Sequence, residues 1–254
     1  MIEPRSRVNE PAVTEDALLG GAVRLLQPAA GHRAGTDAVL LAAAACPEPG
    51  CQILDVGAGT GAVGLMVLIR SPSARLTLIE RDPVLAALCE RNLVLNRREG
   101  RVAVADVLDP RSRRDAGLVS ESADWVLTNP PFLEEGRARL SPNPKRTAAH
   151  ALPEGGLEAW LRACAALLKP KGRLALIHRA DRLRDCLAAL DRSFGAIRLR
   201  PIHPQADRPA IRLLIAATKG SRAPLIVEPP VILHGPSGRF TPEADALHRG
   251  EAIL

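Results

Sequence analysis

The chain has 254 residues, of which 46% are hydrophobic and 24% are charged. These values are typical of a globular protein with a substantial core, and they exclude a low-complexity or collagen-like chain. The formal net charge is +6 and is carried almost entirely by arginine, whose planar guanidinium group suits phosphate, so a polyanionic partner is favoured.

The cysteines and the amino terminus bear on the compartment. None of the five cysteines forms a Cys-x-x-Cys pair, which predicts reduced thiols in a cytoplasmic protein. The first residues are polar, and no apolar run approaches the ~18 residues that a membrane span needs. We therefore expect neither a targeting signal nor a membrane partner.

Residues 1–35 are expected to form an N-terminal extension. Gly20 and Gly21 interrupt an apolar stretch, which predicts a short hairpin that ends before Pro28. Only a loose lead-in is expected ahead of this hairpin.

A helix is expected over 38–45, where an alanine-rich run follows Thr36 and Asp37. A Thr or Asp at this position is typical of a helix N-cap. The first N–H groups of such a helix can also hold a carboxylate ligand. The sequence leaves both possibilities open.

Strands and helices alternate over residues 36–219, the expected core. The expected strands are 52–56, 75–80, 102–105, 124–128, 173–178, 197–202 and 211–217, and the expected helices between them are 62–70, 83–96, 156–168 and 181–190. This alternation predicts an α/β fold with a parallel, doubly wound sheet that binds its ligands at the carboxyl ends of the strands. No helix separates the last two strands, which should be antiparallel. Residues 220–254 are Pro-rich and are expected to pack irregularly on the same domain.

A glycine-rich turn joins the first core strand to its helix. Gly57, Gly59 and Gly61 allow a ligand to approach the backbone closely. The turn alone also fits a dinucleotide-binding pattern, so it does not identify the ligand.

Three acidic residues help to identify the ligand. Asp55, Glu80 and Asp106 each lie at the end of an expected strand and should line one edge of the sheet. Glu80 can accept hydrogen bonds from ribose hydroxyls, and Asp106 can accept one from an adenine amine. Asp55 would repel a pyrophosphate but suits an ammonium group, which favours S-adenosylmethionine over NAD.

The fourth expected strand runs into Asn129, Pro130, Pro131 and Phe132. Two prolines end a strand and preset a rigid corner, since neither can donate a ladder hydrogen bond and each has a fixed φ. An amide and a carbonyl at such a corner, beside an aromatic ring, can accept hydrogen bonds from a flat NH2 group. A simple turn after a strand is the alternative.

The sequence resembles class I S-adenosylmethionine-dependent methyltransferases that methylate amino groups. The resemblance rests on the motif from Asp55 to Gly61, the two later acids and the corner from Asn129 to Phe132. The resemblance implies a Rossmann-like sheet of seven strands in the order 3-2-1-4-5-7-6, with helices on both faces. It also implies that no metal is needed.

The same resemblance implies roles for single residues. It places Asp55 at the methionine end of the cofactor, Glu80 at the ribose, and Asp106 with the backbone of Val107 at the adenine. It places Thr36 and Asp37 near the methionine carboxylate.

The flanking motifs point to one group within these methyltransferases. The segments 18–37, 146–150 and 238–243 are similar to those of the bacterial family that methylates N6 of an adenine in valine tRNA. RNA, most of all tRNA, is therefore the expected partner. Four basic residues after the corner are the expected RNA contacts: Arg137, Arg139, Lys145 and Arg146.

Three alternatives remain open. A protein glutamine N5-methyltransferase uses a similar pocket, because a carboxamide also presents NH2, but residues 1–30 are short for the helical substrate domain usual in those enzymes. A non-catalytic S-adenosylmethionine-binding module would not need the corner at Asn129. An NAD-binding protein is disfavoured by Asp55.

Overall fold

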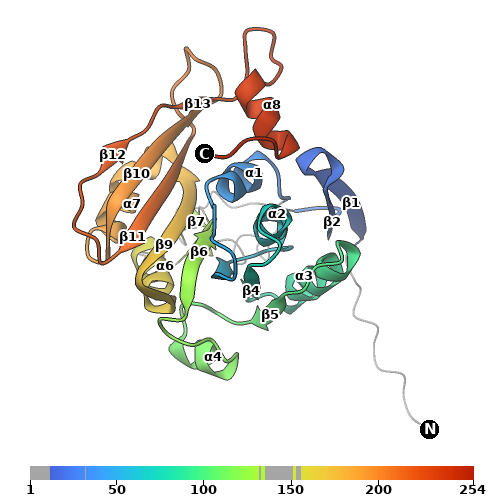
Figure 1. Ribbon diagram of the computed structural model, residues 1–254, viewed down its shortest axis with the longest axis vertical. Coiled ribbons are helices and arrows are strands. Elements are labelled where there is room, and N and C mark those ends of the chain that lie inside the picture. The colour runs from blue at the N-terminus through green and yellow to red at the C-terminus, as the bar shows by residue number, and fades with distance from the viewer. Residues whose placement is uncertain (1–11, 32, 132, 135–150, 153–155) are drawn as a thin grey trace.

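The computed structural model describes residues 12–31, 33–131, 133–134, 151–152 and 156–254. Within these ranges, a nine-stranded sheet forms the centre of the molecule (Figure 1). Its strands are β3 (Gln52–Val56), β4 (Arg75–Glu80), β5 (Arg101–Val104), β6 (Ala123–Thr128), β9 (Leu168–Arg179), β10 (Phe194–His203), β11 (Arg212–Lys219), β12 (Ile226–Val227) and β13 (Val231–Ile232). The order across the sheet is β12-β10-β11-β9-β6-β3-β4-β5, and β13 lies beside β10.

The central strands are parallel, as expected: β3 pairs with β4 and β6, β4 with β5, and β6 with β9. β11 is antiparallel to both β9 and β10, which also agrees with the prediction. The expected count of seven strands is wrong for the described residues, because β12 and β13, of two residues each, add to the outer edge of β10.

The helices lie on both faces of the sheet and have these bounds: α1 (Thr36–Ala43), α2 (Ala62–Arg70), α3 (Pro83–Leu95), α4 (Pro110–Asp115), α6 (Gly156–Leu167), α7 (Leu183–Leu190) and α8 (Pro242–Arg249). Two short 3-10 helices are η1 (Leu19–Gly21) and η2 (Ala180–Arg182). Of the described helices, none is long and apolar enough to cross a membrane.

Side chains alternate between two cores along each strand. In β3, Ile53 belongs to the core formed with α1, α2, α3 and α8, whereas Leu54 and Val56 belong to the core formed with α6 and α7. Successive side chains in a strand point to opposite faces, and both faces of this sheet are covered. The apolar runs that the sequence shows in these strands therefore have a direct structural cause.

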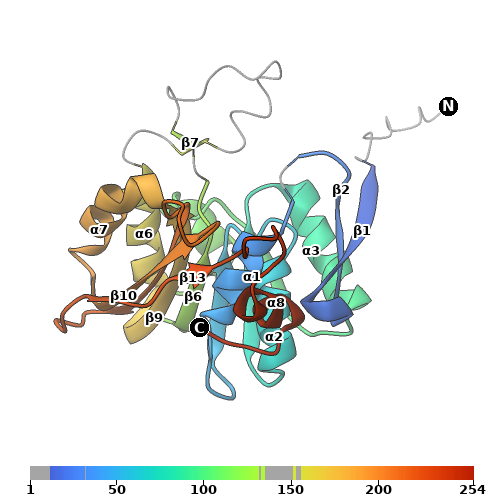
Figure 2. The same cartoon turned by 90° about the horizontal axis from the view of Figure 1, so that it is seen from above.

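An N-terminal hairpin lies outside the large sheet, beside α3 (Figure 2). β1 (Val13–Leu18) pairs antiparallel with β2 (Val23–Pro28), and η1 forms the turn at the expected glycines. A separate pair of two-residue strands, β7 (Leu133–Glu134) and β8 (Ala151–Leu152), is parallel.

Two helices were not expected. α4 begins after Asp109, whose carboxylate accepts from the N–H of Arg111, and α8 begins after Thr241, whose hydroxyl accepts from the N–H of Ala244. Both have proline at the first helical position, where its missing N–H costs nothing. The segment 220–254 is thus more regular than predicted.

Candidate active site

The carboxyl ends of four adjacent strands meet at one edge of the sheet. Val56 is in register with Ile79 of β4 and with Thr128 of β6, and Ile79 is in register with Ala103 of β5. The glycine-rich turn, the acid that ends β4 and the corner after β6 therefore follow one another along this edge. The grouping predicted from the sequence agrees with this register.

The glycine-rich turn has the left-handed backbone that its glycines permit. Gly57, Gly59 and Gly61 have φ values of 73°, 58° and 85°. A Cβ atom on Gly57 would lie 3.0 Å from Cζ2 of Trp160, whereas a Cβ on Gly59 would meet nothing within 4 Å. The outer side of the turn is thus open at Gly59, where a ligand can reach the backbone.

Asp55 is buried beneath this turn, with 2% of its surface exposed. Its Oδ2 accepts a hydrogen bond of 2.9 Å from the N–H of Gly64 in α2. The pKa of Asp55 is raised to about 7, mainly by burial; the hydrogen bond from Gly64 lowers this pKa, and the charge of Glu80 raises it. The carboxyl group of Asp55 therefore supports the start of α2, and its contact with the cofactor stays a prediction.

Glu80 ends β4 and is oriented by two backbone donors. The N–H of Gly59 donates to Oε2 at 2.8 Å, and the N–H of Asp82 donates to Oε1 at 3.0 Å. Burial raises the pKa of Glu80, and these hydrogen bonds oppose the rise. Glu80 thus links the end of β4 to the glycine-rich turn.

Asp106 and Val107 follow β5. Asp106 is half-buried, and its Oδ1 accepts from the N–H of Leu108 at 2.9 Å, while its own N–H donates to Oγ of Ser112. Val107 is buried, and its carbonyl accepts from the guanidinium of Arg113. The loop after β5 therefore has a defined conformation.

The first turn of α1 differs from the capping expectation. Gly35 is the N-cap residue and provides no side-chain bond. The hydroxyl of Thr36 lies 3.2 Å from Nε2 of His248 in α8, and the carboxylate of Asp37 forms an ion pair of 2.9 Å with Arg212 in β11. Both side chains connect distant elements, so neither caps its own helix.

The corner after β6 holds a buried acceptor. Oδ1 of Asn129 is buried and has no hydrogen-bond partner among the described residues. Pro130 is buried and Pro131 is half-buried. A buried acceptor without a partner is costly unless a ligand supplies the donor. Phe132 lies outside the described residues.

Trp160 in α6 supports the end of β6. Its Nε1 donates at 2.9 Å to the hydroxyl of Thr128, which in turn donates at 2.9 Å to the carbonyl of Val56. The structure places Trp160 against both Gly57 and the last residue of β6, a position that no local pattern could have indicated.

The four basic residues expected to contact RNA, Arg137, Arg139, Lys145 and Arg146, lie outside the described residues.

These features fit the predicted cofactor. The backbone at Gly59 is open to a ligand, and the acidic side chains of Asp55 and Glu80 belong to the two strand ends beside it, where acidic groups suit the positive sulfonium and ammonium groups of S-adenosylmethionine. Oδ1 of Asn129 provides an acceptor at the same edge of the sheet.

Comparisons with known proteins identify the family of this chain. Residues 34–201 match the methyltransferase small domain family. A tRNA1(Val) (adenine(37)-N6)-methyltransferase of Porphyromonas gingivalis is 33% identical over 222 residues, which cover 83% of this chain and 85% of that protein. A second relative with the same description, from Dyadobacter fermentans, is 30% identical over 80% of this chain and 82% of its own length.

Solved structures show the same fold. The crystal structure of a predicted O-methyltransferase of Agrobacterium tumefaciens has a TM-score of 0.72 and 34% identity, covering 86% of this chain and 98% of that one. The T. thermophilus 16S rRNA N2 G1207 methyltransferase, solved with AdoMet and guanosine, has a TM-score of 0.55 and 22% identity, covering 82% of this chain and 50% of that one. The chain therefore belongs to the methyltransferase small domain family and is an S-adenosylmethionine-dependent methyltransferase.

Proposed function

We propose that this enzyme transfers the methyl group of S-adenosylmethionine to the exocyclic N6 amine of an adenine in tRNA. The observation that carries this proposal is the buried Oδ1 of Asn129, which has no partner within the described residues and lies at the carboxyl end of β6. The descriptions of the Porphyromonas and Dyadobacter relatives support the same acceptor.

The acceptor amine is a weak nucleophile because its lone pair is delocalised into the purine ring. Oδ1 of Asn129 and the carbonyl of Pro130 accept its two hydrogens and favour a more tetrahedral nitrogen, and Phe132 stacks on the base. S-adenosylmethionine supplies a methyl group on a positive sulfur. The new N–C bond forms as the C–S bond breaks, the sulfur leaves as a neutral thioether, and the nitrogen then loses one proton to solvent. The corner contributes orientation and charge stabilisation.

The cofactor contacts follow the order of the strands. Glu80 binds the ribose, Asp106 and the backbone of Val107 bind the adenine, and Asp55 acts at the methionine end, beside the glycine-rich turn. Because the side chains of Thr36 and Asp37 contact His248 and Arg212, the groups left for the methionine carboxylate are backbone N–H groups at the start of α1.

The RNA contacts come from the segment after the corner. Arg137, Arg139, Lys145 and Arg146 bind phosphates on either side of the target, and the adenine leaves its stack to reach Asn129, as in other enzymes that act on bases. The enzyme acts in the cytoplasm. Its buried thiols, Cys89, Cys164 and Cys186, are free, which suits a reducing compartment.

The test uses labelled S-adenosylmethionine with separate pools of unmodified tRNA, rRNA and protein. We expect label in tRNA, recovered as N6-methyladenosine after nuclease digestion. Label confined to glutamine in protein would support the glutamine N5 alternative. A methylated hydroxyl would instead match the description of the Agrobacterium relative. Either result would overturn the proposal.

The variant Asn129→Ala tests the role of the corner. We expect kcat to fall by about 10²- to 10³-fold, the usual cost of one lost stabilising contact to a reacting group. The dissociation constant for S-adenosylmethionine should change little, because the lost contact is to the acceptor. Asn96→Ala in the segment after α3 is the matched control and should keep its activity. Full methyl transfer by Asn129→Ala would contradict the assignment.

A further inference from the structure

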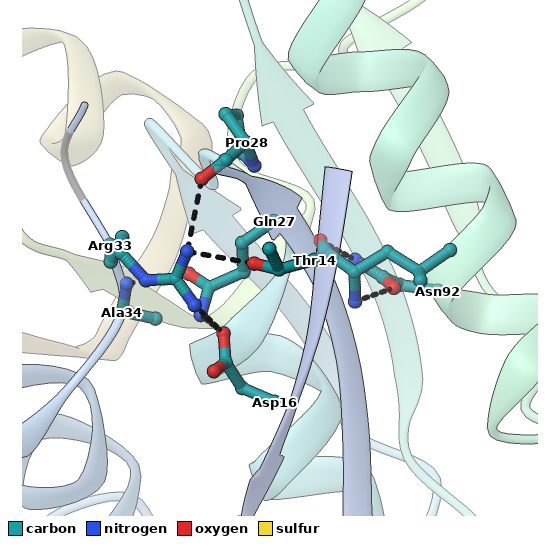
Figure 3. Close-up of polar contacts among 8 residues, drawn as sticks. Thr14, Asp16, Gln27, Pro28, Arg33, Ala34 and Asn92 are labelled. Atoms are coloured by element: carbon teal, nitrogen blue, oxygen red, sulfur yellow. Dashed lines mark hydrogen bonds and ion pairs between the residues drawn. The ribbon is translucent and has the colours of Figure 1, made fainter. Parts of the chain in front are cut away.

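The outer edge of β2 is paired by side chains. Asn96 accepts from the N–H of Arg24 at 2.9 Å and donates to its carbonyl at 2.6 Å. Asn92 does the same for Leu26, at 2.7 and 3.0 Å (Figure 3). Residues 24 and 26 are two apart in β2 and present their backbone groups along the same edge of the strand. Residues 92 and 96 are four apart, one in α3 and the other at its C-cap, so the two spacings match. Two amides thus replace a neighbouring strand.

Asn92 makes one more contact, and this contact is with the glycine-rich turn. Its Nδ2 also donates to the carbonyl of Thr60 at 2.9 Å, and the side chain is fully buried. One turn earlier in α3, the thiol of Cys89 donates to the carbonyl of Gly59 at 3.2 Å. Burial raises the pKa of Cys89, which keeps this thiol protonated as a donor. The turn is therefore held at two successive carbonyls, and Asn92 connects it to the hairpin.

The C-terminal end of β2 holds the backbone that leads into α1. Gln27, which is 1% exposed, accepts from the N–H of Ala34 at 2.7 Å and donates to Asp16 of β1 at 2.7 Å (Figure 3). Arg33 reaches back to the hairpin, where it donates to the hydroxyl of Thr14 at 2.8 Å and forms an ion pair with Asp16. The backbone just before Thr36 is thus fastened to the hairpin.

We propose that the hairpin of β1 and β2 is a clamp for the cofactor site, and that Asn92 and Gln27 are its positioning residues. Asn92 holds the glycine-rich turn at Thr60, and Gln27 holds the start of α1 through Ala34. Neither needs to touch the cofactor, since each acts on backbone that forms the site. The proposal rests on S-adenosylmethionine as the methyl donor and is independent of the acceptor.

The chain offers a matched pair of variants. Asn92→Ala and Asn96→Ala each release one residue of β2 from α3 or its C-cap. Asn96→Ala also frees the carbonyl of Asn92, but only Asn92→Ala frees the carbonyl of Thr60. We expect both variants to lower the melting temperature. The dissociation constant for S-adenosylmethionine, measured by calorimetry without any acceptor, should rise about tenfold in Asn92→Ala and less than twofold in Asn96→Ala. A tenfold change corresponds to the upper range for one net hydrogen bond.

Hydrogen exchange of the cofactor-free protein provides a second readout. Amides of residues 57–64 should exchange faster in Asn92→Ala than in Asn96→Ala. The proposal fails if both variants bind S-adenosylmethionine equally well. It also fails if the affinity of each variant for S-adenosylmethionine falls only in proportion to its lost stability, because Asn92 then has only a structural role.

Gln27→Met keeps the proposal testable if Asn92→Ala does not fold. Methionine has a similar volume and removes both polar contacts of Gln27. Faster exchange at residues 34–38, unchanged exchange at residues 57–64 and a several-fold weaker S-adenosylmethionine affinity are expected. Unchanged affinity would overturn the role of Gln27. These measurements use no RNA, so their failure is distinct from failure of adenine methylation.

Discussion

Asp55 shows how the position of one acid affects the stability of the fold. Its pKa in the folded protein is about 7, above the ordinary value of 3.8, mainly because the carboxyl is buried. The contribution of Asp55 to stability is therefore fully present below pH 3.8 and is lost as the pH rises through about 7. One pKa unit corresponds to about 1.4 kcal/mol, so ionisation costs the fold about 4 kcal/mol across this window.

The variant Asp55→Asn should remove this dependence. Its free energy of unfolding, from urea denaturation of the cofactor-free protein, should fall less between pH 4 and pH 8 than that of the parent. Burial lowers the pKa of His178 to about 4, which acts in the opposite direction below about pH 6.5. The informative quantity is therefore the difference between variant and parent. An equal pH slope in both proteins would show that Asp55 ionises normally.

Gly57 and Gly59 differ in what surrounds them, although both have positive φ. Gly59→Ala should cost about 1–2 kcal/mol of stability, the usual penalty for a side chain in the left-handed region. Gly57→Ala should cost about 2–4 kcal/mol, because the new methyl group also presses on Trp160.

Urea denaturation of the two variants checks this order. Calorimetry adds a second comparison, because a methyl group on Gly59 projects into open space where the cofactor is proposed to bind. Gly59→Ala should weaken S-adenosylmethionine binding more than its effect on stability would suggest. Equal stability costs for the two variants would contradict the contact with Trp160.

At the scale of elements, α8 connects the end of the chain to the start of the core. Its side chains at Ala244 and Leu247 are fully buried, and His248 reaches Thr36 in the first turn of α1. The ring of Phe240 stacks between His248 and His234, with centroids 4.2 and 4.9 Å away. The C-terminal segment therefore supports the helix whose N-terminus is proposed to meet the cofactor.

Thr241→Ala should destabilise α8 and its packing against α1. The hydroxyl of Thr241 accepts from the N–H of Ala244 at 3.1 Å and donates to the carbonyl of Ile232 at 2.7 Å. Loss of an N-cap costs about 1 kcal/mol, and thermal unfolding should show this decrease. Asp109→Ala is the control, since it removes the cap of α4, which buries no side chain, and should change the melting temperature less. A larger loss in Asp109→Ala would contradict this ranking.

At the scale of the whole molecule, one sheet separates two apolar cores and carries the site at a single edge. Because β5, β4, β3, β6 and β9 are parallel neighbours, their carboxyl ends lie at the same edge, and the loops after them can converge on one ligand. The hairpin, α3 and α8 then hold the segments that border this edge. Residues far from the proposed chemistry are thus expected to affect cofactor affinity.

The local part of this arrangement could be predicted from the residues of each segment. The strand bounds at 52–56 and 75–80 agree with the structure, as does the helix at 62–70, because apolar runs, glycines and prolines act on their own neighbours. The helix α4 was missed, because its six residues bury no side chain and so give no apolar pattern. Asn129 directly follows the end of β6, as predicted, and its restriction by Pro130 stays a prediction.

The surroundings of these residues could not be predicted, because they depend on how distant segments pack. Asn92 meets Leu26 across 66 positions of sequence, and Thr36 meets His248 across 212. Burial of Asp55 likewise depends on α2 and the strands beside it, and no local pattern specifies that burial. The physical reason is that hydrogen-bond partners and desolvation depend on which segments pack together in the fold, whereas turns and caps depend on a few adjacent residues.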